Sequence, residues 1–145
     1  MKRFVDLKEG DEVFVISDGE CYKRKVLKKT MKWIVDNVMI ADGSYKLIYG
    51  LTDEIDETRT CPGDYDIEIT IENIDKNCDE PYKFSVDSIN STQYTYRDWF
   101  YVFSDFEALV DYRDWIYSMH VKPWDDIIER LKMMNVIDNE RERYL

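Results

Sequence analysis

Aromatic residues gather in one stretch of this 145-residue chain, and that stretch limits what the chain can fold into. Ten of the 21 Phe, Trp and Tyr residues lie between Tyr94 and Tyr117. Side chains this large must be buried, either by the rest of the chain or by a partner. The residue pattern predicts one long strand, from Tyr94 to Phe103, which closes a β-sheet and leads directly into a helix.

The predicted helix has recognisable start and stop signals. Ser104 and Glu107 have the spacing of a capping box, in which each side chain binds the backbone N–H of the other residue. We expect a helix from Asp105 to about His120, and Pro123 is expected to open a second helix. His120 is the single histidine of the chain. At a helix end it is interpreted as a structural residue, not a catalytic one.

The first hundred residues have the turn chemistry of an antiparallel sheet. Asp18-Gly19 and Asp42-Gly43 each separate two β-type runs, which is a strong short-range signal for a β-hairpin. Residues 66–72 alternate strictly between polar and apolar, so their isoleucines are expected to face a core. Further short strands are predicted at 33–35, 38–40 and 82–86.

The run Leu7 to Ile16 combines an apolar residue, a Gly-Asp turn and a β-branched strand. Over about residues 7–27 the chain resembles the opening of an SH3-like small β-barrel. The resemblance implies an architecture and does not fix a function, because such barrels serve many kinds of binding module.

Strands come first in this chain and helices come last, which predicts an α+β fold. We expect a single domain over residues 1–145. An antiparallel, barrel-like β-sheet is predicted for residues 1–103. Two C-terminal α-helices are predicted for 104–135, and a charged tail for 136–145.

The net charge of −11 is concentrated in the middle of the chain. Residues 51–80 carry eleven Asp and Glu against two Lys and Arg, whereas residues 1–50 have a net charge of +2. Nucleic-acid binders need a basic footprint, so direct nucleic-acid binding is not expected and a basic protein partner is favoured. The candidate partner-binding acids are Asp53, Glu54, Asp56, Glu57, Asp64, Asp66, Glu68 and Glu72.

Catalytic and metal-binding patterns are sparse. There is no Gly-rich phosphate loop, and Cys21, Cys61 and Cys78 are too isolated for a zinc motif. We therefore expect no enzyme activity, no catalytic residues, no metal and no cofactor. The cysteines are not a disulfide framework, and no apolar run reaches the ~18–20 residues that span a bilayer. These features predict a cytoplasmic protein without a membrane partner.

The resulting functional hypothesis is a non-enzymatic, macromolecule-binding protein. Its sharper form is an acidic inhibitor encoded by a phage or mobile element. Such a protein would block a host nucleic-acid-binding protein by imitating nucleic acid, as anti-CRISPR or anti-restriction proteins can. The oligomeric state stays open.

Two alternatives remain at this point. One is a barrel module that binds nucleic acid or protein through a basic run. The other is a small-ligand binder with an aromatic pocket between sheet and helices. The residues for these alternatives are Lys23, Arg24, Lys25, Lys28, Lys29, Lys32, Trp99 and Trp115.

Overall fold

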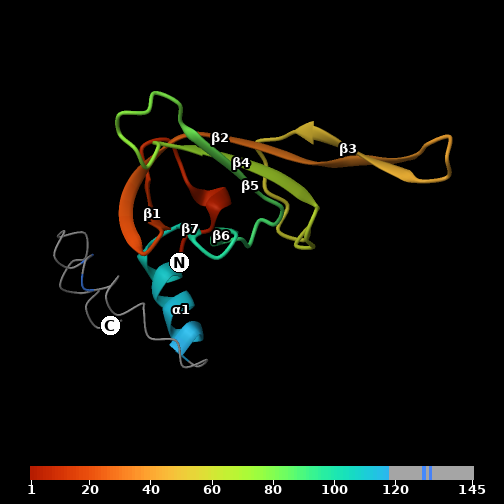
Figure 1. The fold of residues 1–145 in the computed structure, drawn as a ribbon. Coiled ribbons are helices and arrows are strands. Elements are labelled where there is room, and N and C mark those ends of the chain that lie inside the picture. Colours follow the sequence, from red (N-terminus) through yellow and green to blue (C-terminus); the bar gives the residue numbers. More distant parts are fainter. Residues whose placement is uncertain (118–128, 130, 132–145) are drawn as a thin grey trace.

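The computed structural model describes residues 1–117, 129 and 131. In this part of the chain an antiparallel sheet curls into a nearly closed barrel, and helix α1 (Phe106–Tyr117) follows it (Figure 1). The predicted antiparallel, barrel-like sheet with a C-terminal helix is thus confirmed. His120 and the tail from residue 136 lie outside the described residues, and so does the predicted second helix apart from Glu129 and Leu131. The remaining elements are η1 (Phe4–Asp6), β1 (Glu12–Ser17), β2 (Glu20–Met39), β3 (Tyr45–Leu51), β4 (Tyr65–Ile71), β5 (Tyr82–Val86), β6 (Gln93–Tyr96) and β7 (Phe100–Phe103).

The sheet is organised around β2, which has 20 residues. The strand order is β5-β4-β2-β1-β7-β6, and β3 pairs with β2 off this path. Successive thirds of β2 pair with β1, β4 and β3. The prediction of separate short strands at 33–35 and 38–40 was wrong. Asp36 and Asn37 stand inside a continuous ladder, opposite Ile48 and Leu47, and a bulge absorbs the break in apolar pattern just before them.

Both Asp-Gly turns form as predicted. Asp18 and Gly19 have φ values of 50° and 77°, the positive pair that a tight hairpin turn requires. At the second turn Gly43 has a φ of 88°, and the Ser44 N–H donates to the Asp42 carboxylate at 2.9 Å. These local signals were reliable because the turn geometry depends on the turn residues themselves.

The prediction of one long strand from Tyr94 to Phe103 was wrong, because the chain reverses direction within this range. The range forms a hairpin, in which β6 and β7 pair antiparallel with Tyr96 opposite Phe100. Arg97 in the turn has a φ of 56°, so the chain reverses there although no glycine is present. The aromatic alternation continues on both sides of this turn and hides it.

The start of α1 also differs from the prediction. Asp105, and not Ser104, caps the helix, because its Oδ1 accepts from the Ala108 N–H at 2.9 Å. The Ser104 hydroxyl instead donates to the Lys2 carbonyl. Glu107 pairs with the N-terminal amine at 3.1 Å. The N-terminal segment thus takes the two side chains that the capping box would have used.

Two hydrophobic clusters hold these elements together. The first fills the barrel and includes the η1 side chains Phe4 and Val5, together with Ile67, Ile69 and Ile71, all between 0% and 1% exposed. The second lies between α1 and the outer face of β1 and β7. β1 and β7 therefore pack on both faces, which accounts for their continuous apolar pattern.

The barrel is not closed by hydrogen bonds between β5 and β6. Aromatic side chains bridge this seam instead. The rings of Phe84 and Tyr94 stack at 4.7 Å between centroids, and those of Tyr82 and Phe100 lie 4.9 Å apart. Of the helices in the described residues, none has the length and apolar character to cross a membrane.

Candidate functional site

The eight candidate acids do not form one surface. Five lie in the loop between β3 and β4, two on β4, and Glu72 directly after β4. Several have local structural partners. Glu57 pairs with Arg3 at 2.9 Å, and Glu72 accepts from the Lys25 N–H at 2.7 Å. The Asp56 carboxylate accepts from the Thr58 N–H and hydroxyl, which holds the pKa of this carboxyl below its usual range.

The acidic row on β4 has a mixed surrounding. Asp66 stands opposite Lys32 of β2, and Glu68 stands opposite Thr30 of β2 and Ser85 of β5. Cross-strand neighbours of this kind lie about 5 Å apart between Cβ atoms. The outer face of β4 is therefore less uniformly negative than its own sequence indicates.

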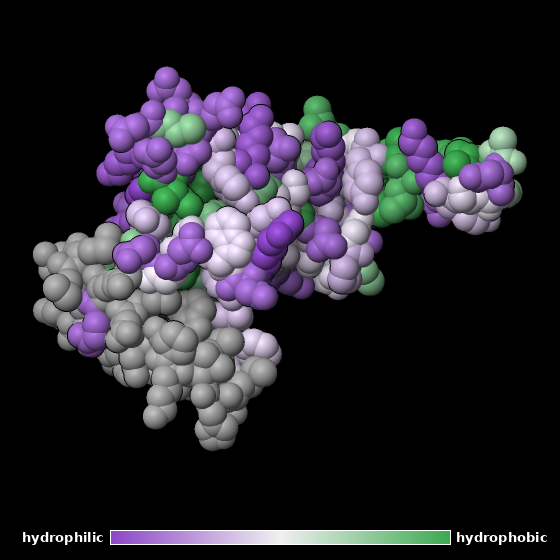
Figure 2. Space-filling model, in the orientation of Figure 1, coloured by the Kyte–Doolittle hydropathy of each residue, from purple (hydrophilic) through white to green (hydrophobic). Residues whose placement is uncertain are grey.

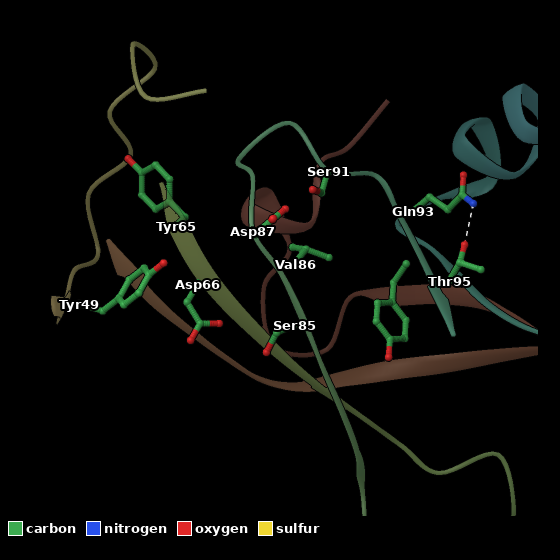
Figure 3. A pocket seen from close by; sticks show the side chains of 10 residues that line it. Tyr49, Tyr65, Asp66, Ser85, Val86, Asp87, Ser91, Gln93 and Thr95 are labelled. Carbon is green, nitrogen blue, oxygen red and sulfur yellow. Dashed lines mark hydrogen bonds between the residues drawn. The ribbon is translucent and has the colours of Figure 1, made fainter. Parts of the chain in front are cut away.

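A recess at the open seam of the barrel brings acids and aromatic residues together. It has a volume of ≈ 480 Å³ and is bordered by β3, β4, β5 and β6 (Figure 3). Its lining contains two carboxylates, three tyrosines and several small polar residues, and none of the lining residues is basic. These residues are Tyr49, Tyr65, Asp66, Ser85, Val86, Asp87, Ser91, Gln93, Tyr94 and Thr95. We call it the seam recess.

Two tyrosines that line the seam recess anchor the loop between β3 and β4 (residues 52–64), which we call the acidic loop. The Tyr49 hydroxyl donates to the Gly63 carbonyl at 2.9 Å. The Tyr65 hydroxyl accepts from the Asp56 N–H at 2.8 Å. The acidic loop is thereby held at Asp56 and Gly63 by two residues that line the recess. Of the candidate acids, the recess itself contains Asp66 alone.

Sequence reasoning missed Asp87, Tyr49 and Tyr94 as members of this site. They come from three elements that meet only because the β5 and β6 ends of the sheet approach each other. A period-2 pattern shows which side of a strand a residue occupies, but it does not show which sheet edges meet. No local signal in the sequence could have found this set.

The chemistry of the seam recess fits a cation. Ionised carboxylates accept hydrogen bonds from guanidinium and ammonium groups, and such charge-assisted bonds are about twice as strong as neutral ones. The faces of tyrosine rings add cation–π attraction where a ring is accessible. Asp66 is half-buried and Asp87 is exposed, so an entering side chain can contact one carboxylate inside the recess and another at its rim.

A second recess, of ≈ 520 Å³, lies at the far end of β4 and is mostly built from the loop 73–81. Glu72, Asp75, Asp79 and Glu80 line it, but Lys76 does so as well. In the part of the chain that the structure describes, no group of three or more Asp, Glu, His or Cys residues is arranged to hold a metal ion.

The basic run of β2 is largely used for structure. Arg24 is 7% exposed and donates to the carbonyls of Asn73, Ile74 and Lys23. Lys23 pairs with Glu12 at 3.3 Å. Lys29 donates to the Val5 carbonyl, and burial lowers its pKa. Three residues of the run remain exposed on the sheet, namely Lys25, Lys28 and Lys32.

The two tryptophans of the aromatic alternative belong to different clusters. Trp99 contacts Tyr96 and Phe100 in the β6–β7 turn, whereas Trp115 contacts Tyr112 on α1. A recess of ≈ 380 Å³ between sheet and helix includes Trp115 but not Trp99. Burial raises the pKa of Tyr112, which also lines it, to about 12. The structure thus does not join Trp99 and Trp115 into one pocket.

Together these features define a small, nearly closed antiparallel barrel with an acidic, tyrosine-lined seam and a long hairpin extension. Comparison with protein-family models, with curated proteins and with solved structures finds no match for this chain. Its function is therefore argued from the site alone.

Proposed function

We propose that this protein is a non-enzymatic binder of a basic protein and that the seam recess receives a lysine or arginine side chain of that partner. The observation that carries the proposal is the lining of the recess, which has two carboxylates, three tyrosines and no basic residue. The acidic loop beside it extends the negative surface, and the chain as a whole carries −11. Long-range attraction would bring a basic partner to this side of the molecule.

The partner proposed is a nucleic-acid-binding protein, since such proteins present arginines and lysines in a groove that fits phosphates. The protein would then act as an acidic inhibitor of the kind found in phages and mobile elements. The SH3-like architecture belongs to the same proposal, because small barrels of that kind often serve as binding modules. The outer face of β4 carries basic and neutral neighbours as well as acids. We therefore assign the binding site to the recess, and not to a row of β4 carboxylates that imitates phosphates.

Two substitutions that remove negative charge from the recess test this proposal. Asp66→Asn with Asp87→Asn removes both carboxylates of the lining and keeps the size of the side chains. Asp79→Asn with Glu80→Gln is the matched control, because it removes the same charge from the other recess. Tagged protein is used to capture partners from a bacterial lysate at low and at high salt.

The wild type and the control pair are expected to retain a basic protein that high salt releases, because attraction between exposed charges is screened. The Asp66/Asp87 pair is expected to lose it. Equal retention by both double variants would assign the binding to net charge and contradict a site in the seam recess.

A further inference from the structure

Among the described residues, most of the exposed large apolar side chains lie in a hairpin that projects from the barrel. Beyond Trp33, the end of β2 and most of β3 leave the barrel as a two-stranded hairpin (Figure 1). We call residues 34–51 the arm. Figure 2 shows hydrophobic residues along it. Of the fourteen exposed large hydrophobic residues in the described chain, eight lie in the arm. They include Val35, Met39, Tyr45, Leu47 and Leu51, at 44% to 74% exposure.

Such a hairpin is not expected to stand alone in water. Two strands without a covering layer are marginal, and contiguous exposed apolar surface marks an interaction site. The exposed side chains lie on both faces of the arm, because Leu47 and Ile48 are consecutive in β3 and point to opposite sides. A partner that covers one face would therefore leave the other exposed, whereas pairing along an edge lets side chains of neighbouring strands contact each other on both faces.

β3 offers an edge for such pairing. Among the described strands it pairs with β2 alone, so its other edge is open from Tyr45 to Leu51. Natural edge strands are commonly protected by proline, by several charges or by a bulge on the edge. β3 contains no proline and one charged residue, Lys46. The bulge of the arm lies in β2, on the inner side.

The distribution of charge favours a second copy of the chain as the occupant. The arm carries Asp36, Asp42 and Lys46, a net charge of −1, so ten of the eleven net negative charges lie elsewhere. Two copies therefore repel each other least where their arms meet. An antiparallel β3–β3 pair centred on Ile48 sets Tyr45 opposite Leu51, Lys46 opposite Gly50 and Leu47 opposite Tyr49. In this register no charge faces a like charge, as a stable cross-strand arrangement requires.

We propose that the chain forms a twofold dimer by antiparallel pairing of the two β3 edges about Ile48. The two arms then make a continuous four-stranded ribbon in which the same residues contact each other from both copies. Tyr49 belongs to both the arm and the seam recess, but the two carboxylates of the recess lie outside the arm. The proposal therefore does not rest on the binding of a basic side chain in the recess, and its failure would not contradict that binding.

The test is sedimentation velocity of the full chain from about 1 to about 200 µM, a range that spans micromolar dissociation constants. We expect a dimer to accumulate with concentration for the wild type. Ile48→Lys sets two lysines against each other at the twofold axis, so this variant is expected to stay monomeric. Leu27→Lys is the matched control, since Leu27 is 43% exposed outside the arm. It is expected to behave like the wild type.

A charge-reversal mixture makes the test specific to the axis. Ile48→Glu alone is expected to be monomeric, and an equimolar mixture with Ile48→Lys is expected to restore the dimer. Far-ultraviolet circular dichroism confirms that each variant is folded. A wild type that stays monomeric throughout the range would overturn the proposal, and so would dimerisation of either single variant.

Discussion

Truncation to alanine should lower the free energy of unfolding by very different amounts at two isoleucines, one in the barrel and one in the arm. Ile69 in β4 is 0% exposed in the barrel, whereas Ile48 in β3 is 36% exposed in the arm. At about 0.8 kcal/mol per buried carbon, Ile69→Ala loses about 2.4 kcal/mol of transfer free energy. The cavity left in a packed core adds to this loss, so we expect a total of roughly 3–4 kcal/mol.

Ile48→Ala is expected to lower the free energy of unfolding by less than about 1 kcal/mol, since Ile48 is already 36% exposed and lies outside both hydrophobic clusters. Urea unfolding of both variants at about 1 µM protein measures this difference, with association of the arms kept negligible. Unchanged slopes against denaturant would show that the denatured states are comparable. A loss at Ile48 as large as that at Ile69 would refute the view that the arm lies outside the core.

Two further predictions concern the N-terminal segment and the helix. Asp105→Ala is expected to lower the free energy of unfolding by about 1 kcal/mol, because the helix loses its cap. Glu107→Gln is expected to lower it by less, because the ion pair of Glu107 is partly exposed. Urea unfolding compares the two variants, and a larger loss for Glu107→Gln would favour the capping box. The hydrogen bond from Arg3 lowers the pKa of Asp6 below its ordinary 3.8, so its stabilising contribution is present above that pH and is lost as the pH falls through the lower, folded value. The acid limb of the stability curve should therefore be flatter in Asp6→Asn than in the wild type, and identical limbs would count against this ion pair.

Features set by a few neighbouring residues were predictable from the sequence. The turns at Asp18-Gly19 and Asp42-Gly43 and the buried isoleucines of β4 depend on local chemistry and on a strict alternation. The reversal at Arg97 was missed because the aromatic pattern on either side is uninterrupted. The helix cap was misassigned because the N-terminus, about a hundred residues away, binds Ser104 and Glu107.

The sequence indicated that a candidate site would be negatively charged, but it did not indicate where in the fold that site lies. The concentration of acids between residues 51 and 80 indicated a negative surface, and Asp66 does line the seam recess. Asp87 and Tyr94 join it only through the approach of β5 and β6, which depends on how far the whole sheet curls. The arm was hidden for a similar reason. Residues 38–40 were predicted as a short strand, and nothing in the pattern of Val38 and Met39 shows whether another layer covers them.

The most direct test of the central claim is the paired capture experiment in one bacterial lysate, with the wild type, the Asp66→Asn/Asp87→Asn variant and the Asp79→Asn/Glu80→Gln variant side by side. We predict that a basic nucleic-acid-binding protein is retained at low salt by the wild type and by the second variant, and that it is absent from the first. Retention of that protein by all three, or by none, would contradict a binding site in the seam recess.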